Sequence, residues 1–129
     1  MDKTLNLKLE QFKKTLSGLK KSLEEEKNDL VRDSAIKRFE YSYELCWKTV
    51  KMFLSEKFGE DIFSPKECFR VLRKNKLISD EETELLLQMT DDRNQIIHTY
   101  SEVFSEELYE DISQSYYQLL EKVYKILEQ

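Results

Sequence analysis

Glycine and proline are nearly missing from this sequence of 129 residues, which contains two glycines and one proline. Tight turns between strands depend on glycine, proline and asparagine, so their scarcity argues against a strand-rich fold. It also excludes the glycine-rich loops that hold phosphates in dinucleotide-binding and P-loop enzymes. Many leucine, glutamate and lysine residues with so few helix breakers favour long helices joined by short loops.

Cysteine and histidine are also scarce. The two cysteines, Cys46 and Cys68, are far apart in apolar surroundings, a placement more typical of small buried hydrophobes than of a disulfide. With His98 as the only histidine, a Cys/His zinc site is not expected, and we expect neither a metal nor a cofactor. The sequence has no apolar run of membrane-spanning length and no apolar signal core near its charged start, so we expect a cytoplasmic protein without membrane contact.

The net charge of −5 is unevenly distributed. Residues 32–76 contain eleven Lys/Arg against seven Asp/Glu, whereas residues 77–129 contain three against thirteen. An acidic protein is a poor general binder of nucleic acid, because phosphate contacts supply most non-specific affinity. The charge pattern still allows a basic face on residues 32–76. It also allows the acidic residues 77–129 to attract a basic partner.

Apolar residues recur at intervals of three and four, which predicts amphipathic helices. We expect helices at about residues 3–26, 30–58, 65–74 and 80–97, with a last one starting near residue 105. The predicted fold class is all-α, with residues 1–129 forming a single domain. Its architecture is expected to be an antiparallel four-helix bundle with an additional short helix.

Residues that start and stop helices support these boundaries. Gly59 is expected to end the second helix, as glycine commonly does just past a helix. Ser64, with Pro65 in the first turn, is expected to start the short helix. Ser79 and Glu82 match a capping box that opens the next helix.

The run from Arg93 to Tyr100 contains the only side chain that titrates near neutral pH without a large shift, His98. On a helix Arg93 and Tyr100 fall within about 20° of one another, while Asn94 and His98 form a second row. Arg93 and His98 are about 140° apart, so one straight helix does not point them at a common atom. A second copy of the helix across a two-fold axis would bring them together, which favours a homodimer if the run forms a site.

A simpler interpretation of this run follows from spacing alone. An arginine and a histidine near a helix end can serve only to cap carbonyl groups and oppose the helix dipole. The neighbouring acidic residues Asp91, Asp92 and Glu102 also allow Arg93 to form an ordinary surface ion pair.

A second motif occupies residues 38–48. Glu40 and Glu44 lie within an aromatic band, and burying them unpaired would be unfavourable, so they should meet arginine or lysine partners. The aromatic residues alone are typical of a core, with the charges solvated; the alternative is a polar pocket lined by aromatic rings. In that alternative the substrate-binding candidates are Arg38, Glu40, Tyr43, Glu44, Trp47 and Lys48.

These two motifs, with residues 64–67, Arg70 and residues 77–80 between them, occur in an order that resembles a known family. It is the family of nucleotidyltransferase substrate-binding proteins, close to the HepT toxins of the HEPN superfamily. The resemblance implies a helical bundle that dimerises and is encoded beside a minimal nucleotidyltransferase. The polymerase-like catalytic site would then belong to the partner chain.

The resemblance also implies roles for the run from Arg93 to Tyr100. In the HepT branch an Arg-x4–6-His motif is read as a metal-independent RNase site. Arg93 would stabilise the charge of the transition state, Asn94 would orient the histidine or a phosphate, and His98 would act as general acid or base. Tyr100 matches the tyrosine that the partner enzyme adenylylates in related pairs.

Three hypotheses follow. The favoured one is a partner subunit of a two-component nucleotidyltransferase system of toxin–antitoxin type, with Tyr100 as the adenylylation site. The second is an autonomous RNase toxin that uses Arg93, His98 and Tyr100, with RNA or a nucleotide as its ligand. The third is a purely structural helical bundle.

Overall fold

The computed structural model describes residues 3–99 and 101–129, and all regular secondary structure in these ranges is helical. The elements are α1 (Lys3–Glu24), α2 (Asp29–Phe58), α3 (Pro65–Lys74), α4 (Asp80–His98), α5 (Glu102–Asp111), the π-helical segment η1 (Ile112–Tyr116) and α6 (Tyr117–Leu127). The predicted all-α class is confirmed.

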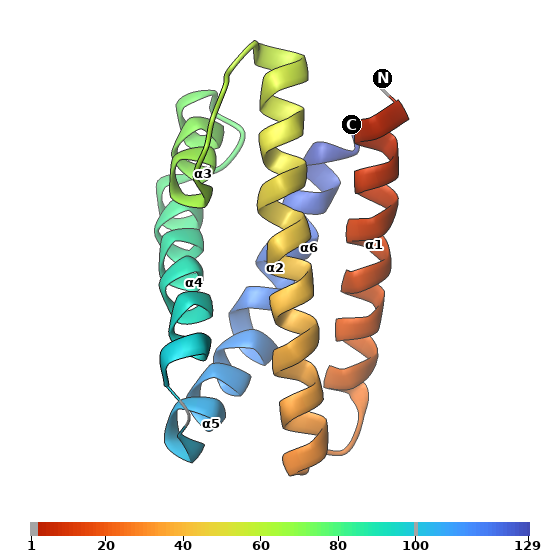
Figure 1. Cartoon of the computed structure of the whole chain (residues 1–129), viewed down its shortest axis with the longest axis vertical. Coiled ribbons are helices and arrows are strands. Elements are labelled where there is room, and N and C mark those ends of the chain that lie inside the picture. The colour runs from red at the N-terminus through yellow and green to blue at the C-terminus, as the bar shows by residue number, and fades with distance from the viewer. Residues whose placement is uncertain (1–2, 100) are drawn as a thin grey trace.

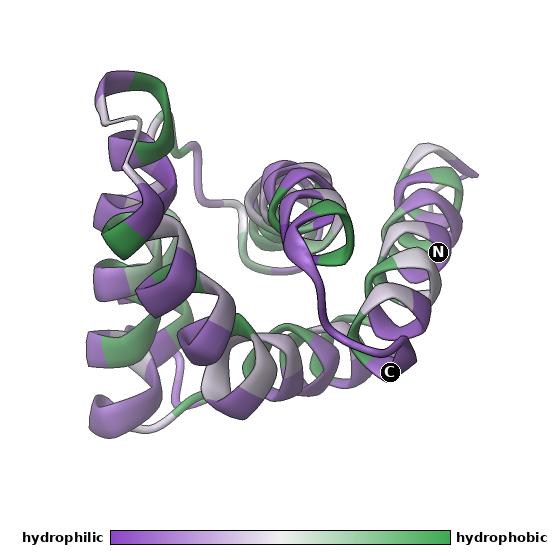
Figure 2. Cartoon of the chain, turned by 90° about the horizontal axis from the view of Figure 1, so that it is seen from below, coloured by the Kyte–Doolittle hydropathy of each residue, from purple (hydrophilic) through white to green (hydrophobic). Residues whose placement is uncertain are grey.

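The long helices alternate in direction along the long axis of the molecule (Figure 1). Helix α2 lies between α1 and the pair α3 and α4 (Figures 1 and 2). Elements α5, η1 and α6 follow one another without a break and form one rod that crosses α2 obliquely. The architecture is therefore an antiparallel bundle of four rods with α3 as the additional short helix.

Most helix ends follow the predicted signals. Gly59 ends α2 in a left-handed conformation with φ of 65°. This conformation favours glycine, because a Cβ atom would be strained there. Ser79 and Glu82 form both hydrogen bonds of the capping box that starts α4. Ser64 occupies the N-cap position of α3, but its side chain forms no capping hydrogen bond within the described residues, so the expected cap is present in position only.

The last rod differs from the expectation. It starts at Glu102 instead of near Ser105, because the Ser101 side chain accepts a hydrogen bond from the backbone of Phe104 at 3.1 Å and so caps α5. The π-helical turn η1 inserts one residue into the helical repeat, and both Ile112 and Tyr116 are buried. The apolar spacing alone did not predict this shift in register.

Aromatic rings from α2, α3 and η1 meet in the core. Phe39 stacks on Tyr116 with ring centroids 5.8 Å apart, and Tyr43 meets the edge of Phe69 at 6.2 Å. Full burial of such side chains contributes about 1.5–3 kcal/mol each to the free energy of unfolding. Cys46 and Cys68 are buried as free thiols. No helix within the described ranges is long and apolar enough to cross a membrane.

Candidate functional site

The central contact of the candidate site joins α2 to α4. The guanidinium of Arg93 pairs with the Glu44 carboxylate at 2.8 Å, and both side chains are only about a third exposed or less. The guanidinium also lies over the Tyr43 ring, 5.6 Å from its centroid. Such double contact orients the planar guanidinium more firmly than a single exposed ion pair does.

Tyr43 supports Arg93 from the core. The hydroxyl of Thr90 donates to the backbone carbonyl of Leu86 at 2.9 Å, and it lies 2.6 Å from the Tyr43 hydroxyl. Because the proton of Thr90 is engaged, the Tyr43 hydroxyl is the donor in this second bond. Burial raises the pKa of Tyr43, so the phenol stays neutral and acts as a fixed platform.

Glu44 is held by three donors. Partial burial by itself raises its pKa, but hydrogen bonds from Lys48 and Trp47 and the charge of Arg93 together lower it below the ordinary value. Lys48 lies 3.1 Å from the carboxylate, and the Trp47 indole nitrogen donates to it at 3.3 Å. The prediction that Glu44 meets basic partners is confirmed. The carboxylate therefore remains ionised at neutral pH.

Glu44, Trp47 and Arg93 border a hollow of about 600 Å³, which we call the Arg93 hollow. Its lining residues are Glu44, Trp47, Ser64, Pro65, Lys66, Arg70, Thr90, Arg93 and Asn94. Three of them carry a positive charge and one a negative charge, so the hollow favours an anion.

Lys66 and Arg70 were not among the predicted site residues. They lie four residues apart, on one face of α3, and line the hollow together with Arg93. Lys66 also pairs with Asp91 of α4 at 2.7 Å, which ties the two helices together at this point. Their four-residue spacing in the segment that starts at Ser64 was the available signal, but only the packing of α3 on α4 brings them to Arg93.

The other members of the run have different positions. Asn94 is exposed and lines the Arg93 hollow. His98 is the last residue of α4, is exposed, and is not among the residues that line the hollow. Tyr100 lies outside the described residues. Within one chain, Arg93 and Asn94 therefore share a surface with the second motif, whereas His98 does not.

Arg38 and Glu40 are separate from this group. Arg38 donates a hydrogen bond to the carbonyl of Gly18 at 2.7 Å and so faces α1. Glu40 lies 3.9 Å from Lys37 and lines a smaller hollow of about 240 Å³ beside Thr99. The structure brings together Tyr43, Glu44 and Trp47 from the second motif, but not these two residues.

A buried arginine fixes the segment that follows the run. Arg32 of α2 is almost fully buried and pairs with Glu102 at 2.7 Å and Glu106 at 2.9 Å, both in α5. The hydrogen bond from Arg32 lowers the pKa of Glu102, and bonds from Lys27 and Arg32 lower that of Glu106. These contacts hold the start of α5 against α2, three residues beyond Thr99.

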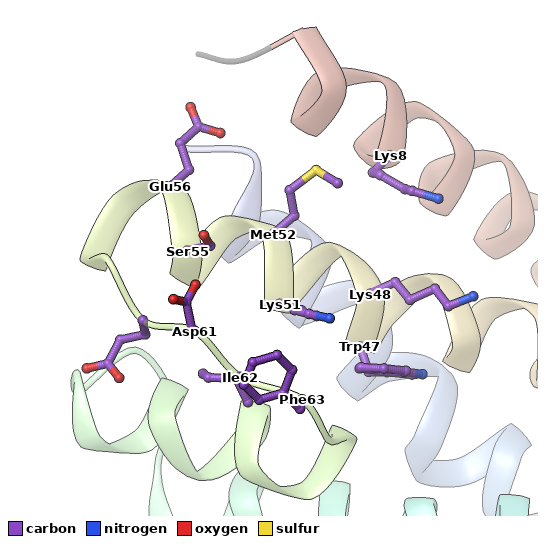
Figure 3. Close-up of a pocket in the computed structure, with 11 residues that line it drawn as sticks. Lys8, Trp47, Lys48, Lys51, Met52, Ser55, Glu56, Asp61, Ile62 and Phe63 are labelled. Carbon is purple, nitrogen blue, oxygen red and sulfur yellow. The ribbon is translucent and has the colours of Figure 1, made fainter.

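A second hollow of about 610 Å³ shares Trp47 with the Arg93 hollow (Figure 3). Its lining includes Trp47, Lys48, Lys51, Ile62 and Phe63, and we call it the Lys51 hollow. Two predicted substrate-binding residues, Trp47 and Lys48, thus line it. In the described part of the chain, no group of three or more His, Cys, Asp or Glu side chains is arranged to hold a metal ion.

Comparison with known proteins identifies a matching family model and a similar crystal structure. The family model described as nucleotidyltransferase substrate binding protein like matches residues 7–129. A crystal structure of a protein from Thermus thermophilus is 37% identical, with a TM-score of 0.86, over 92% of this chain and 99% of that chain. No curated protein sequence gives a significant match.

More distant structures share the fold. The tri-AMPylated HEPN toxin of Shewanella oneidensis, in complex with an MNT antitoxin, is 17% identical with a TM-score of 0.80, covering 99% of this chain and 98% of that chain. A toxin–antitoxin complex with AMP-PNP gives the same identity and TM-score, over 98% of this chain and 99% of that chain. At this level of identity the likeness concerns the arrangement of helices.

Proposed function

Because the chain belongs to the nucleotidyltransferase substrate-binding protein-like family, we propose that it is the partner subunit of a two-component minimal nucleotidyltransferase system. The Arg93 hollow is the observation that carries the proposal. It combines a guanidinium fixed by Glu44 and Tyr43 with two further cations on α3. Such a surface suits a phosphate-bearing group that a partner enzyme presents or transfers.

An exposed apolar pair next to His98 supports a protein interface at this end of the bundle. Ile97, near the end of α4, is 72% exposed, and Val103, near the start of α5, is 68% exposed. Large apolar side chains that remain exposed at one end of a bundle are typical of surfaces that another chain covers. In a homodimer formed through this end, His98 of one chain would lie near residues of the other chain. Arg93 and His98 are about 140° apart on one helix, so a second chain is needed to bring the two kinds of side chain together.

Tyr100 is the proposed acceptor of an AMP group. It directly follows Thr99, which ends α4 in an extended conformation. The Shewanella oneidensis toxin of the same fold is AMPylated and bound to an MNT antitoxin. An adenylyl group on Tyr100 would add a phosphate charge and a large base to the segment that follows α4.

Co-purification tests the partner role. The chain is expressed without a tag, together with a tagged minimal nucleotidyltransferase, which the proposal expects to be encoded beside it. We expect the two chains to elute as one complex from affinity and size-exclusion columns. Separate elution of the unaltered chains would contradict the proposal.

A second function, an RNase, is favoured by one observation: His98 is exposed at the end of the helix that carries Arg93. An accessible imidazole can exchange protons with an RNA hydroxyl. Incubation of the purified protein with RNA should give cleavage that His98→Ala abolishes and that Gln88→Ala, on an exposed turn of the same helix, leaves intact. Absence of cleavage by the unaltered protein would remove this alternative.

A further inference from the structure

The Lys51 hollow combines apolar walls with segregated charges. Trp47 and Met52 of α2 and Ile62 and Phe63 of the following linker supply apolar surface, and Phe63 is 79% exposed (Figure 3). An aromatic ring held this far into solvent on a short linker is unusual for a side chain that serves only the core. The Lys51 hollow has a volume of about 610 Å³, which falls in the range of small-molecule sites.

Lysines lie along the helical side of the hollow. Lys8 comes from α1, and Lys48 and Lys51 come from α2, so two separate elements supply the ammonium groups. Lys51 lies 5.5 Å from the centroid of the Phe63 ring. Lys48 is also paired with Glu44 at 3.1 Å, so Lys8 and Lys51 are the cations best placed beside the two aromatic side chains. Such a combination suits an aromatic ring with an attached anionic group.

Carboxylates occupy the opposite side. Glu56 comes from the last turn of α2, and Glu60 and Asp61 belong to the linker between α2 and α3. In Figure 3 Glu56 and Asp61 lie away from the three lysines. Carboxylates accept hydrogen bonds from hydroxyl and amino groups. The hollow thus offers cations for an anionic end of a ligand and acceptors for a donor-rich end.

We propose that the Lys51 hollow is a binding site for a nucleoside monophosphate. The base lies against Trp47 and Phe63, the phosphate meets Lys8 and Lys51, and the ribose or base donors face Asp61. This site is separate from the Arg93 hollow, and its existence does not depend on the partner role proposed above.

Trp47 provides the readout, because it is the only tryptophan in the chain. AMP is titrated into the purified protein without any partner, and fluorescence is excited at the red edge of the indole band, where adenine does not absorb. We expect saturable quenching. Adenosine and inorganic phosphate should each bind at least about tenfold more weakly than AMP, because each lacks one half of the recognised group.

Variants locate the site. Lys51→Ala and Phe63→Ala should each weaken AMP binding by about tenfold. Lys57→Ala and Phe58→Ala are matched controls, since neither residue lines the hollow, and they should stay within about twofold. Circular dichroism and thermal midpoints check that every variant is folded.

Three results would overturn the proposal. The first is the absence of saturable quenching by AMP. The second is equal binding of inorganic phosphate and AMP, which would indicate an anion site that does not recognise the base. The third is loss of AMP binding in Arg70→Ala with no effect of Lys51→Ala and Phe63→Ala, which would place the nucleotide in the Arg93 hollow.

Discussion

Arg93 and Glu44 are the residues on which the candidate site is built. Neither is deeply buried, yet each has several partners: Arg93 has a carboxylate and an aromatic ring, and Glu44 has an arginine, a lysine and an indole. Charged side chains with several fixed partners contribute more to stability than isolated exposed pairs. The same contacts hold the guanidinium in place at the wall of the Arg93 hollow.

Glu44→Gln tests this arrangement. We expect it to lower the free energy of unfolding by about 1 kcal/mol at pH 7, because the amide loses the charge that Arg93 and Lys48 neutralise. Glu40→Gln on the same helix is the control and should change the free energy of unfolding by a few tenths of that amount. Among the described residues, the ion pair that Glu40 forms is the 3.9 Å contact with exposed Lys37. Urea denaturation measures both.

The effect of Glu44 depends on pH in a defined direction. Its folded pKa is below the ordinary value of 4.5, so the ionised group stabilises the fold above pH 4.5. This contribution is lost as the pH falls through the lowered pKa. The difference between the unaltered protein and Glu44→Gln should therefore be constant near neutral pH and shrink below pH 4.5. A difference that grows on acidification would contradict the assignment.

At the residue scale the sequence predicted part of the site. The spacing of Tyr43, Glu44 and Trp47 and the cost of burying a carboxylate predicted a paired Glu44. Lys66 and Arg70 were missed because nothing in their local sequence specifies which helix α3 packs against. Arg38 was grouped with the others because it shares their helix, but it turns toward α1.

At the scale of elements, two helix starts that look alike in sequence differ in structure. Ser79 caps α4 with a reciprocal pair of hydrogen bonds, whereas Ser64 forms no side-chain capping bond in the described chain. Ser79→Ala should therefore lower the free energy of unfolding by about 1 kcal/mol, and Ser64→Ala by much less. Thermal or urea denaturation of the two variants side by side measures the contrast, and equal losses would refute it.

Arg32 joins two elements, and its replacement tests how the start of α5 is held. Arg32→Met leaves Glu102 and Glu106, which are 72% and 43% exposed, free to regain water. We therefore expect a loss of only about 1–2 kcal/mol, with faster hydrogen exchange in residues 101–106. Arg73→Met, which removes an exposed pair with Asp80 at 3.1 Å, is the control and should change exchange there very little. Unchanged exchange at 101–106 in Arg32→Met would show that other contacts hold α5.

The elements themselves were largely predictable, because apolar periodicity and end signals act locally. The boundaries of α2 and α3 and the capping box of α4 followed from such signals. The start of α5 at Glu102 also has a local signal, the Ser101 cap, which the apolar spacing alone did not reveal. The π-helical turn was not predicted, because a one-residue insertion within a continuous helix leaves no end signal in the sequence. Tyr116 in that turn stacks on Phe39 and donates a hydrogen bond to Asp92, next to Arg93.

At the scale of the whole molecule, the all-α bundle was predicted from composition and periodicity, and the family from an ordered set of motifs. The proposed dimer is a further expectation at this scale. Light scattering coupled to size exclusion should give twice the mass of one chain, and Ile97→Glu should halve it because a buried charge disfavours an apolar interface. Leu7 belongs to the first turns of α1, and α1 starts at the end of the bundle opposite to the end of α4 (Figure 1). Leu7→Glu should therefore leave the mass unchanged. A single-chain mass for the unaltered protein would rule out the dimer.

The most direct test of the central proposal is the intact mass of this chain after incubation with its partner nucleotidyltransferase, ATP and Mg²⁺. The partner role predicts a rise by whole AMP groups, with the first group on Tyr100 and Tyr100→Phe lacking it, while Tyr41→Phe, an exposed tyrosine elsewhere, keeps it. An unchanged mass in the presence of an active partner enzyme would contradict the account.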